Sequence, residues 1–347
     1  MNDISKKKLH FNIQSELRKY LKRYSRELNL PVGYADLDHY ENSVSLCDKA
    51  GRDTLWETVY YSQSEMTELN KSLCSVYALL KTEGDVSVME HLYVNRVDFC
   101  PFGNSKPFRI RITNKFNDNY DYFYVKKADA SRIYGLELEH ILSPNRISYI
   151  VDGSTIIEEH IAGIPGDVFI KEWLDTDVTL NRTRLAKEFV KFNERCFVRL
   201  LGDMRSYNYV VDITPDFDDV QYRIKAIDFD QQTYEGRKTM YLPQYFKDNN
   251  PIVGFCSNFL NKETIRQYQK EERTMIANRV KVSRYRLKDL GDCMERDTIS
   301  TPDKVDQLKH ELAVHFDEPA FLDCNNMGEI LKARLYILLY ANKQVFG

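Results

Sequence analysis

Apolar positions in the first ninety residues recur mainly with the period of a helix. In residues 6–28, five apolar or aromatic side chains lie at helical spacing among basic residues: Leu9, Ile13, Leu17, Leu21 and Tyr24. Pro31 and Gly33 close that predicted helix. Residues 51–84 also read as largely helical, with Ser62 and Glu65 forming a capping box. We therefore expect residues 1–90 to form a helical N-terminal region.

The pattern changes near residue 95, where short segments alternate apolar and polar positions. Three of them, 96–102, 108–114 and 120–127, are rich in aromatic and β-branched residues and are separated by turn residues. They predict three consecutive antiparallel strands. A helical period follows over 128–142. A hairpin is then predicted, because strand-like segments flank an Asp-Gly-Ser turn. From about residue 167 onward the chain reads as mainly helical.

Length and charge narrow the classes of protein that this chain can represent. Its 347 residues, 43% of them hydrophobic, suffice for two lobes. The 49 Lys and Arg nearly balance the 52 Asp and Glu, so the net charge of −3 offers no overall attraction to nucleic acid or to an anionic membrane. The start lacks a signal-peptide pattern, and no apolar run is long enough to span a bilayer. We expect a soluble, cytoplasmic protein.

The cysteines give no sign of a metal site or a cross-linked fold. They are scattered without a Cys-x-x-Cys pair and without a histidine at ligand spacing, at positions 47, 74, 100, 196, 256, 293 and 324. This distribution indicates neither a zinc site nor a disulfide framework. We expect reduced, mostly buried thiols.

The segment LLGDMRSYNYVVDI, residues 200–213, places polar groups just before a β-branched run. Asp203 follows a glycine, and Asn208 lies five positions later. The segment AIDFD then brings Asp228 and Asp230, the first of them twenty residues beyond Asn208. Carboxylate and carboxamide oxygens are the hard donors that magnesium prefers. By itself, however, this spacing agrees equally well with a turn that the Asp caps.

The order of elements and motifs resembles the protein-kinase-like superfamily. GDMRSYN resembles the catalytic loop with its five-residue step from Asp to Asn, and AIDFD resembles the metal-binding D-F-G. Both segments are closest in style to the aminoglycoside and choline kinases. The resemblance implies a bilobal α+β fold: a small antiparallel β lobe over 91–162 and a larger, mostly α-helical lobe over 163–347, preceded by the helical region 1–90.

The resemblance also implies roles for the residues of these two motifs. Asp203 would be the catalytic base, and Arg205 would touch the transferred phosphate. Asn208 and Asp228 would hold Mg²⁺, and Asp230, where the motif normally has glycine, adds a further carboxylate as a metal ligand. ATP and Mg²⁺ are therefore the implied cofactors.

The segment YFYVKK, residues 122–127, resembles the strand whose lysine grips the ATP phosphates. Strand alternation puts Phe123 and Val125 on the core face, so that Lys126 points into the cleft, and Lys127 is the alternative. The helix after this strand should supply a glutamate partner for the lysine.

Glu137 is the preferred partner and Glu139 the alternative; two residues apart on a helix, they cannot face the same way. The segment TIIEEHIAGIPG, which begins at residue 155, resembles the hinge of these kinases. This likeness implies that backbone groups from Glu159 to Ile161 meet the adenine of ATP.

The resemblance predicts an ATP- and Mg²⁺-dependent phosphotransferase that acts on the hydroxyl of a small molecule or metabolite. A small acceptor is favoured because Pro243 follows Asp228 after only fifteen residues, without an Ala-Pro-Glu motif. Three features depart from the family pattern: Leu201 in place of the loop histidine, Asp230, and a strand connection, residues 102–107, with one glycine. An atypical protein kinase, a nucleotidyl transferase and a catalytically idle kinase-like binding module remain as alternatives.

Overall fold

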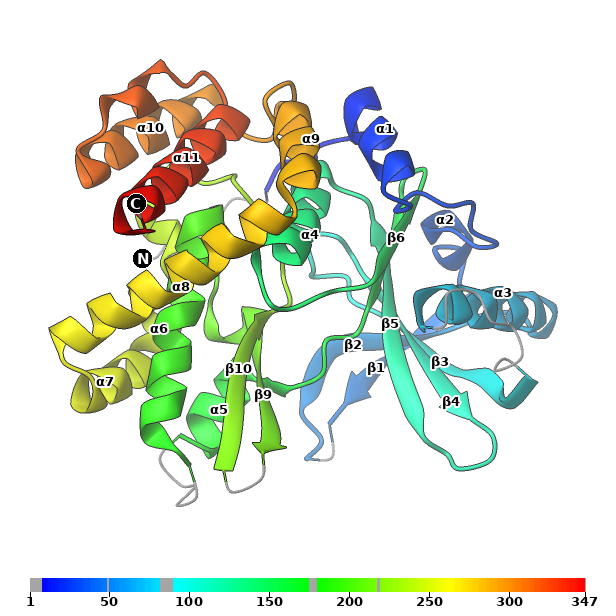
Figure 1. Ribbon diagram of the computed structural model, residues 1–347. Coiled ribbons are helices and arrows are strands. Elements are labelled where there is room, and N and C mark those ends of the chain that lie inside the picture. Colours follow the sequence, from blue (N-terminus) through cyan, green and yellow to red (C-terminus); the bar gives the residue numbers. More distant parts are fainter. Residues whose placement is uncertain (1–7, 49, 82–89, 175–179, 217–218, 347) are drawn as a thin grey trace. The chain divides into compact units, whose positions relative to one another are not determined.

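The computed structural model describes residues 8–48, 50–81, 90–174, 180–216 and 219–346 (Figure 1). The chain divides into two compact units. The first comprises Met1–Asp129 and Ile147–His160, and the second comprises Ala130–Arg146 and Ile161–Gly347. A seven-stranded antiparallel sheet dominates the described part of the first unit, and helices dominate that of the second. The predicted α+β class is confirmed.

The first unit combines helices with a seven-stranded antiparallel sheet. Its elements are α1 (Ser15–Arg23), α2 (Tyr34–Leu37), β1 (Asn42–Cys47), β2 (Asp53–Tyr60), α3 (Gln63–Lys81), β3 (Leu92–Phe99), β4 (Phe108–Asn114), β5 (Tyr120–Lys127), β6 (Tyr149–Asp152) and β7 (Thr155–Glu159). The strand order is β1-β2-β3-β4-β5-β7-β6, and all neighbours are antiparallel. The three predicted strands are β3, β4 and β5, and the predicted hairpin is β6–β7.

One face of this sheet forms the hydrophobic core of the first unit. Val97, Ile110, Phe123 and Val125 point to the same side of their strands and are almost completely buried. Helix α3 covers them with apolar side chains at helical spacing, such as Leu73. Because side chains alternate along a strand, the residues between these positions face the opposite side of the sheet. Lys126 belongs to that second face.

Residues 51–62 do not form the helix that was expected from the sequence pattern. Residues 53–60 form β2, in antiparallel register with β1. Residues 54–59 contain two threonines, a tryptophan and a valine, which favour a pleated strand over a helix. Helix α3 begins only at Gln63 and is described as far as Lys81. Residues 82–84, the end of the predicted helix, lie outside the described residues.

The predicted capping box stands at the start of α3. The Ser62 backbone N–H donates to the Glu65 carboxylate at 3.1 Å, and the Glu65 N–H donates to the Ser62 hydroxyl at 3.3 Å. This reciprocal pair satisfies two backbone donors that a helix start leaves without partners. The other predicted helix, over 6–28, is shorter than expected. It spans Ser15–Arg23 and ends before Ser25, whose φ is +55°.

The second unit is mainly helical and contains a small sheet. Its elements are α4 (Ala130–Leu142), β8 (Ile164–Pro165), α5 (Gly166–Glu172), α6 (Arg182–Arg199), η2 (Ser206–Asn208), β9 (Tyr209–Asp216), β10 (Asp219–Ala226), η3 (Lys238–Tyr241), η4 (Pro243–Tyr245), η5 (Lys247–Asn249), α7 (Asn250–Phe259), α8 (Lys262–Val282), α9 (Arg284–Met294), α10 (Pro302–Phe316), η6 (Pro319–Asp323) and α11 (Met327–Phe346). Strands β9 and β10 form an antiparallel hairpin, and β8 joins the other edge of β9. Helix α4 lies between β5 and β6 in sequence yet packs within this unit, against α6, α8 and α9.

Candidate functional site

The loop that carries the Gly-Asp pair follows helix α6 in the second unit. Leu201 is completely buried and forms a β-bridge with Gln232. The Gly202 N–H donates to the Gln231 carbonyl oxygen at 3.1 Å, and a Cβ at Gly202 would lie only 3.1 Å from that same oxygen. Leucine in place of the expected histidine therefore serves as an apolar anchor, and the glycine permits a close approach between the two loop segments.

Asp203 has a strained backbone and a specific side-chain partner. Its φ of +57° lies in the left-handed region, which Asn and Asp tolerate better than most residues. Its N–H donates to the Met240 carbonyl oxygen at 3.0 Å. Its carboxylate Oδ1 accepts from Arg205 Nε at 3.0 Å, and Arg205 Nη1 also lies 3.3 Å from the Asp248 carboxylate. The arginine thus orients the Asp203 carboxylate through a hydrogen-bonded ion pair.

The pKa of the Asp203 carboxyl is raised to about 6, mainly by burial and to a smaller extent by the nearby charges of Asp228 and Glu235, while Arg205 lowers it. The Asp203 side chain is 27% exposed, so its oxygens are not sealed from solvent. A carboxylate with a pKa near 6 is ionised at neutral pH and is a stronger base than an ordinary aspartate. Perturbation by burial and a like charge is typical of functional sites.

Asn208 is fixed beside Asp203 by its own amide group. Its Nδ2 donates to the Asp203 carbonyl oxygen at 2.7 Å, which leaves Oδ1 as the end of the carboxamide that can ligate a cation. The Asn208 carbonyl oxygen accepts from the Ile227 N–H at 3.0 Å. Because β9 starts right after Asn208 and β10 ends just before Ile227, the hairpin brings Asn208 next to Asp228 across a gap of twenty residues.

Asp228 and Asp230 share one buried arginine. Arg132 Nη1, from helix α4, lies 3.0 Å from Asp228 Oδ1 and 2.8 Å from Asp230 Oδ1. The Asp230 N–H also donates to Asp228 Oδ1 at 3.0 Å. The Asp228 side chain is 33% exposed, whereas those of Asp230 and Arg132 are 8% and 2% exposed. Of the two carboxylates, Asp228 is the one that a ligand in solvent can reach.

The two glutamates of α4 have arginine partners within the second unit. Glu137 is completely buried, and its carboxylate accepts from Nε and Nη2 of Arg286 on α9 at 2.8–3.0 Å. Glu139 forms an ion pair with Arg199 on α6. As their spacing predicts, the two side chains point to different neighbours. Their expected pairing with a lysine of β5 stays a prediction.

In the first unit, Lys126 lies on the sheet face opposite the core. Its Nζ donates to Glu158 Oε2 on β7 at 2.9 Å, and both side chains are less than 10% exposed. The core-facing positions of Phe123 and Val125 are confirmed. Lys127, the alternative, is exposed, and its Nζ lies 4.9 Å from the centre of the Tyr34 ring. Of the two lysines, only Lys126 is held by a buried carboxylate among the described contacts.

The predicted hinge falls at the end of β7. The Glu159 N–H donates to the Ser148 carbonyl oxygen at 3.0 Å, and Glu159 Oε1 accepts from the Ser148 N–H at 2.6 Å. Ile161 is half-buried and begins the next segment of the second unit. Its contact with adenine stays a prediction.

Sequence reasoning missed Arg132 and Glu158. Arg132 lies in the segment predicted as a helix, but nothing in its neighbours signals two carboxylates almost a hundred residues away. Glu158 directly precedes Glu159, the first residue of the predicted hinge. Because side chains alternate along β7, Glu158 and Ile157 lie on different faces of the sheet, and Glu158 shares its face with Lys126. The pairing of β5 with β7 is the signal that would have identified Glu158.

Asn208 and Asp228 fit magnesium in the chemistry of their donors. Both offer oxygen, and the carboxamide orientation is fixed by the bond to Asp203. Asp230 fits less well, because it is nearly buried and lies against Arg132. Within the described ranges, no group of three or more His, Cys, Asp or Glu side chains could hold a metal ion. A magnesium ion here would therefore need oxygen ligands from its phosphate partner or from water.

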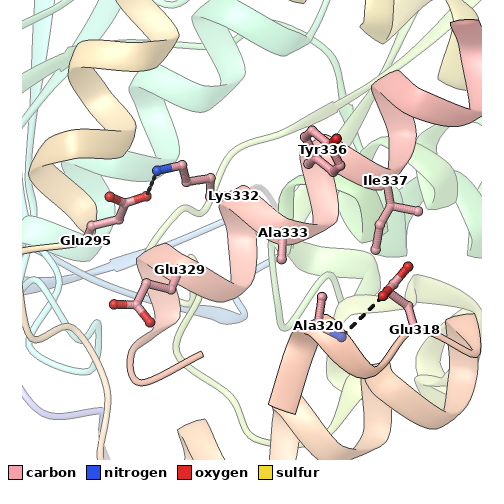
Figure 2. A pocket seen from close by; sticks show the side chains of 8 residues that line it. All are labelled: Glu295, Glu318, Ala320, Glu329, Lys332, Ala333, Tyr336 and Ile337. Atoms are coloured by element: carbon pink, nitrogen blue, oxygen red, sulfur yellow. Dashed lines mark hydrogen bonds and ion pairs between the residues drawn. The ribbon is translucent and has the colours of Figure 1, made fainter. Parts of the chain in front are cut away.

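A separate pocket of about 580 Å³ lies between η6 and α11 in the second unit (Figure 2). Ala320 and Ala333 lie on its two sides, with Glu318, Glu329 and Lys332 among its polar lining residues. None of the predicted site residues lines it.

All seven cysteines are free thiols. No helix in the described parts of the chain has both the length and the apolar character to cross a membrane.

Comparison with models of known protein families finds none that matches this chain, and comparison with curated proteins finds no significant relative.

Proposed function

We propose that this chain is a bilobal, protein-kinase-like phosphotransferase that uses ATP and Mg²⁺ to phosphorylate a hydroxyl of a small molecule or metabolite. The observation that supports it most is the convergence of Asp203, Asn208 and Asp228 at the open end of the β9–β10 hairpin. A base, a carboxamide oxygen and an accessible carboxylate are the parts that phosphoryl transfer requires from a protein.

Each of these residues has a distinct role in the proposed reaction. Asp203 accepts or orients the proton of the acceptor hydroxyl, and Arg205 holds the carboxylate in position. Asn208 and Asp228 would hold Mg²⁺, which would supply positive charge to neutralise the phosphates. Arg205 is 39% exposed and has donors to spare, so it would also contact the transferred phosphate.

Lys126 is the proposed phosphate-binding residue of the first unit. Its ammonium group is buried beside Glu158, which fixes the long side chain before a ligand arrives. In this proposal Glu158 of the sheet is the acidic partner that holds Lys126 in the absence of ligand. Glu137 is still proposed as the helix glutamate that the resemblance implies. The backbone from Glu159 to Ile161 is still proposed as the adenine-binding hinge.

A second candidate function is a catalytically idle kinase-like binding module. Arg132 favours it, because this guanidinium already provides positive charge to Asp228 and Asp230, the two carboxylates assigned to metal. An arginine can therefore replace part of the electrostatic role of a cation at this position. Nucleotide transfer and an atypical protein acceptor remain alternatives, and mass analysis of the modified acceptor separates phosphate from nucleotide addition.

We expect Mg²⁺-ATP to raise the melting temperature of the chain and Asp228→Ala to remove the magnesium dependence of that shift. Alanine offers no oxygen that can replace the carboxylate. At a ligand concentration one hundred times the dissociation constant, binding stabilises the folded state by about 2.7 kcal/mol. Thermal melting with ATP, with and without magnesium, measures the effect.

Asp212→Ala is the matched control, because Asp212 lies on the same hairpin and pairs with Lys225 at 2.7 Å. The control should retain the full magnesium effect. No melting shift with millimolar Mg²⁺-ATP in the unmodified chain would contradict the nucleotide-binding proposal itself. A magnesium effect that survives in Asp228→Ala would exclude Asp228 as the required ligand.

A further inference from the structure

Helices α9 and α11 of the second unit enclose a mostly apolar groove with a volume of about 330 Å³. Leu287 of α9 and Leu331 and Leu335 of α11 form its walls, and Leu138 and Val280 contribute from α4 and α8. The volume falls in the range of small-molecule sites. The catalytic loop contributes no residue to this groove, so its proposed ligand is independent of the proposed phosphotransferase activity.

The lining of the groove extends along α9 from Arg284 to the point where α9 meets α11. At Gly328 a Cβ would lie 2.3 Å from the Met294 carbonyl group, so the start of α11 touches the end of α9. Arg284 stands at the opposite end of α9, ten residues earlier, which corresponds to roughly 15 Å along a helix. The groove is therefore elongated along α9, with the Lys332–Glu295 ion pair near the contact between the helices and Arg284 near its other end.

Gly291 leaves part of this groove unfilled. It lies inside helix α9 and lines the groove, and a Cβ built there would meet no atom within 4 Å. Glycine inside a helix lowers stability relative to alanine. Gly328 has a steric reason to be glycine, whereas Gly291 has none. The side chain missing at Gly291 leaves space for a ligand.

The charges at the groove favour an anionic ligand. Arg284 donates to the Tyr285 hydroxyl at 2.9 Å, but no carboxylate in the described parts of the chain pairs with it. The other two cations of the lining, Lys288 and Lys332, are each neutralised by an acid. Arg284 is thus the cation that is available to a ligand's negative group.

We propose that this groove binds a long-chain carboxylate, with the aliphatic tail between α9 and α11 and the carboxylate at Arg284. Apolar walls remove the tail from water, and a guanidinium forms a charge-assisted hydrogen bond with a carboxylate. All residues that line the proposed binding site, including Leu138 of α4, belong to the second unit.

Calorimetric titration of the full chain with dodecanoate below its micelle concentration tests the proposal. We expect saturable binding with a negative heat-capacity change. Gly291→Leu should abolish binding, because the new side chain occupies the groove. Arg284→Gln should weaken dodecanoate binding about tenfold, the usual scale for a lost charged hydrogen bond, and leave the weaker binding of dodecanol unchanged.

Gly254→Leu is the matched control, since Gly254 lies in α7 with nothing within 4 Å of a Cβ, and it should bind dodecanoate normally. Absence of binding to the unmodified chain overturns the proposal. Equal losses of dodecanoate and dodecanol in Arg284→Gln overturn the placement of the carboxylate. A dimer in sedimentation that Gly291→Leu converts to monomers, without dodecanoate binding, assigns the groove to a second copy of the chain instead.

Discussion

Asp203→Asn is expected to lower phosphotransferase turnover by about a hundredfold or more while Mg²⁺-ATP still raises the melting temperature. The carboxamide keeps the shape of the side chain and tolerates the left-handed backbone at φ +57°. It does not accept a proton from the acceptor hydroxyl. The comparison of steady-state rates with melting shifts in the same preparations separates catalysis from nucleotide binding.

The rate of the unmodified chain should depend on pH through the same carboxylate. Because burial raises the pKa of Asp203 to about 6, activity should fall tenfold per pH unit below that value and level off above it. Arg205→Ala should reduce turnover less than Asp203→Asn does. A wild-type rate in Asp203→Asn removes Asp203 from the role of base.

Stability should change in the opposite direction to activity in Asp203→Asn. The pKa of Asp203 is higher in the folded chain than its ordinary value of 3.8, so the folded state binds this proton more tightly. The resulting contribution to stability is complete below about pH 4 and disappears as pH rises through 6. Asparagine cannot ionise, so above pH 6 the variant should be more stable by about 2–3 kcal/mol, at 1.36 kcal/mol per pKa unit. Urea unfolding at pH 5 and pH 8 measures the difference. A destabilised variant at pH 8 would instead indicate a capping role for the carboxylate.

Periodicity predicted the elements whose pattern is local. Helix α4 and strands β3 to β7 repeat their apolar positions with one clear period, and each forms close to its predicted position, although β3 spans Leu92–Phe99 instead of 96–102. The segment that became β2 carries β-branched and aromatic residues beside a helical period, and pairing with β1 determined its structure. Strand pairing is a long-range property, so the helix prediction failed there.

The candidate site shows the same limit. Asp203, Asn208 and Asp228 could be selected from the sequence, because their spacing in two short motifs resembles that of protein-kinase-like enzymes. Arg132 could not, because it lies almost a hundred residues from the carboxylates that it contacts, on an element assigned another role. Short motifs in the sequence can indicate candidate groups, whereas the partners that neutralise or orient those groups come from the tertiary fold.

Arg132 is the residue on which the proposed phosphotransferase and the proposed idle module differ. In the active form, its guanidinium orients Asp228 and offsets the repulsion between two nearby acids. In the idle form, its positive charge replaces that of the metal ion beside Asp228 and Asp230. In both, a fully buried arginine beside a nearly buried aspartate is costly to separate, since removal of one partner leaves the other charge desolvated.

Arg132→Met is therefore expected to lower the free energy of unfolding by about 3–5 kcal/mol, because Asp230 keeps its charge in a buried site. Adding Asp230→Asn should recover a large part of that loss, since the carboxamide carries no charge. Arg52→Met is the control: its pair with Asp48 is exposed, and its loss should cost less than about 1 kcal/mol. Urea unfolding of the four chains measures these values. If Arg132→Met is as stable as the unmodified chain, the arginine is not neutralising a buried charge. If the double variant folds and binds magnesium more tightly with ATP than the unmodified chain does, Arg132 competes with the cation, and the idle module is favoured.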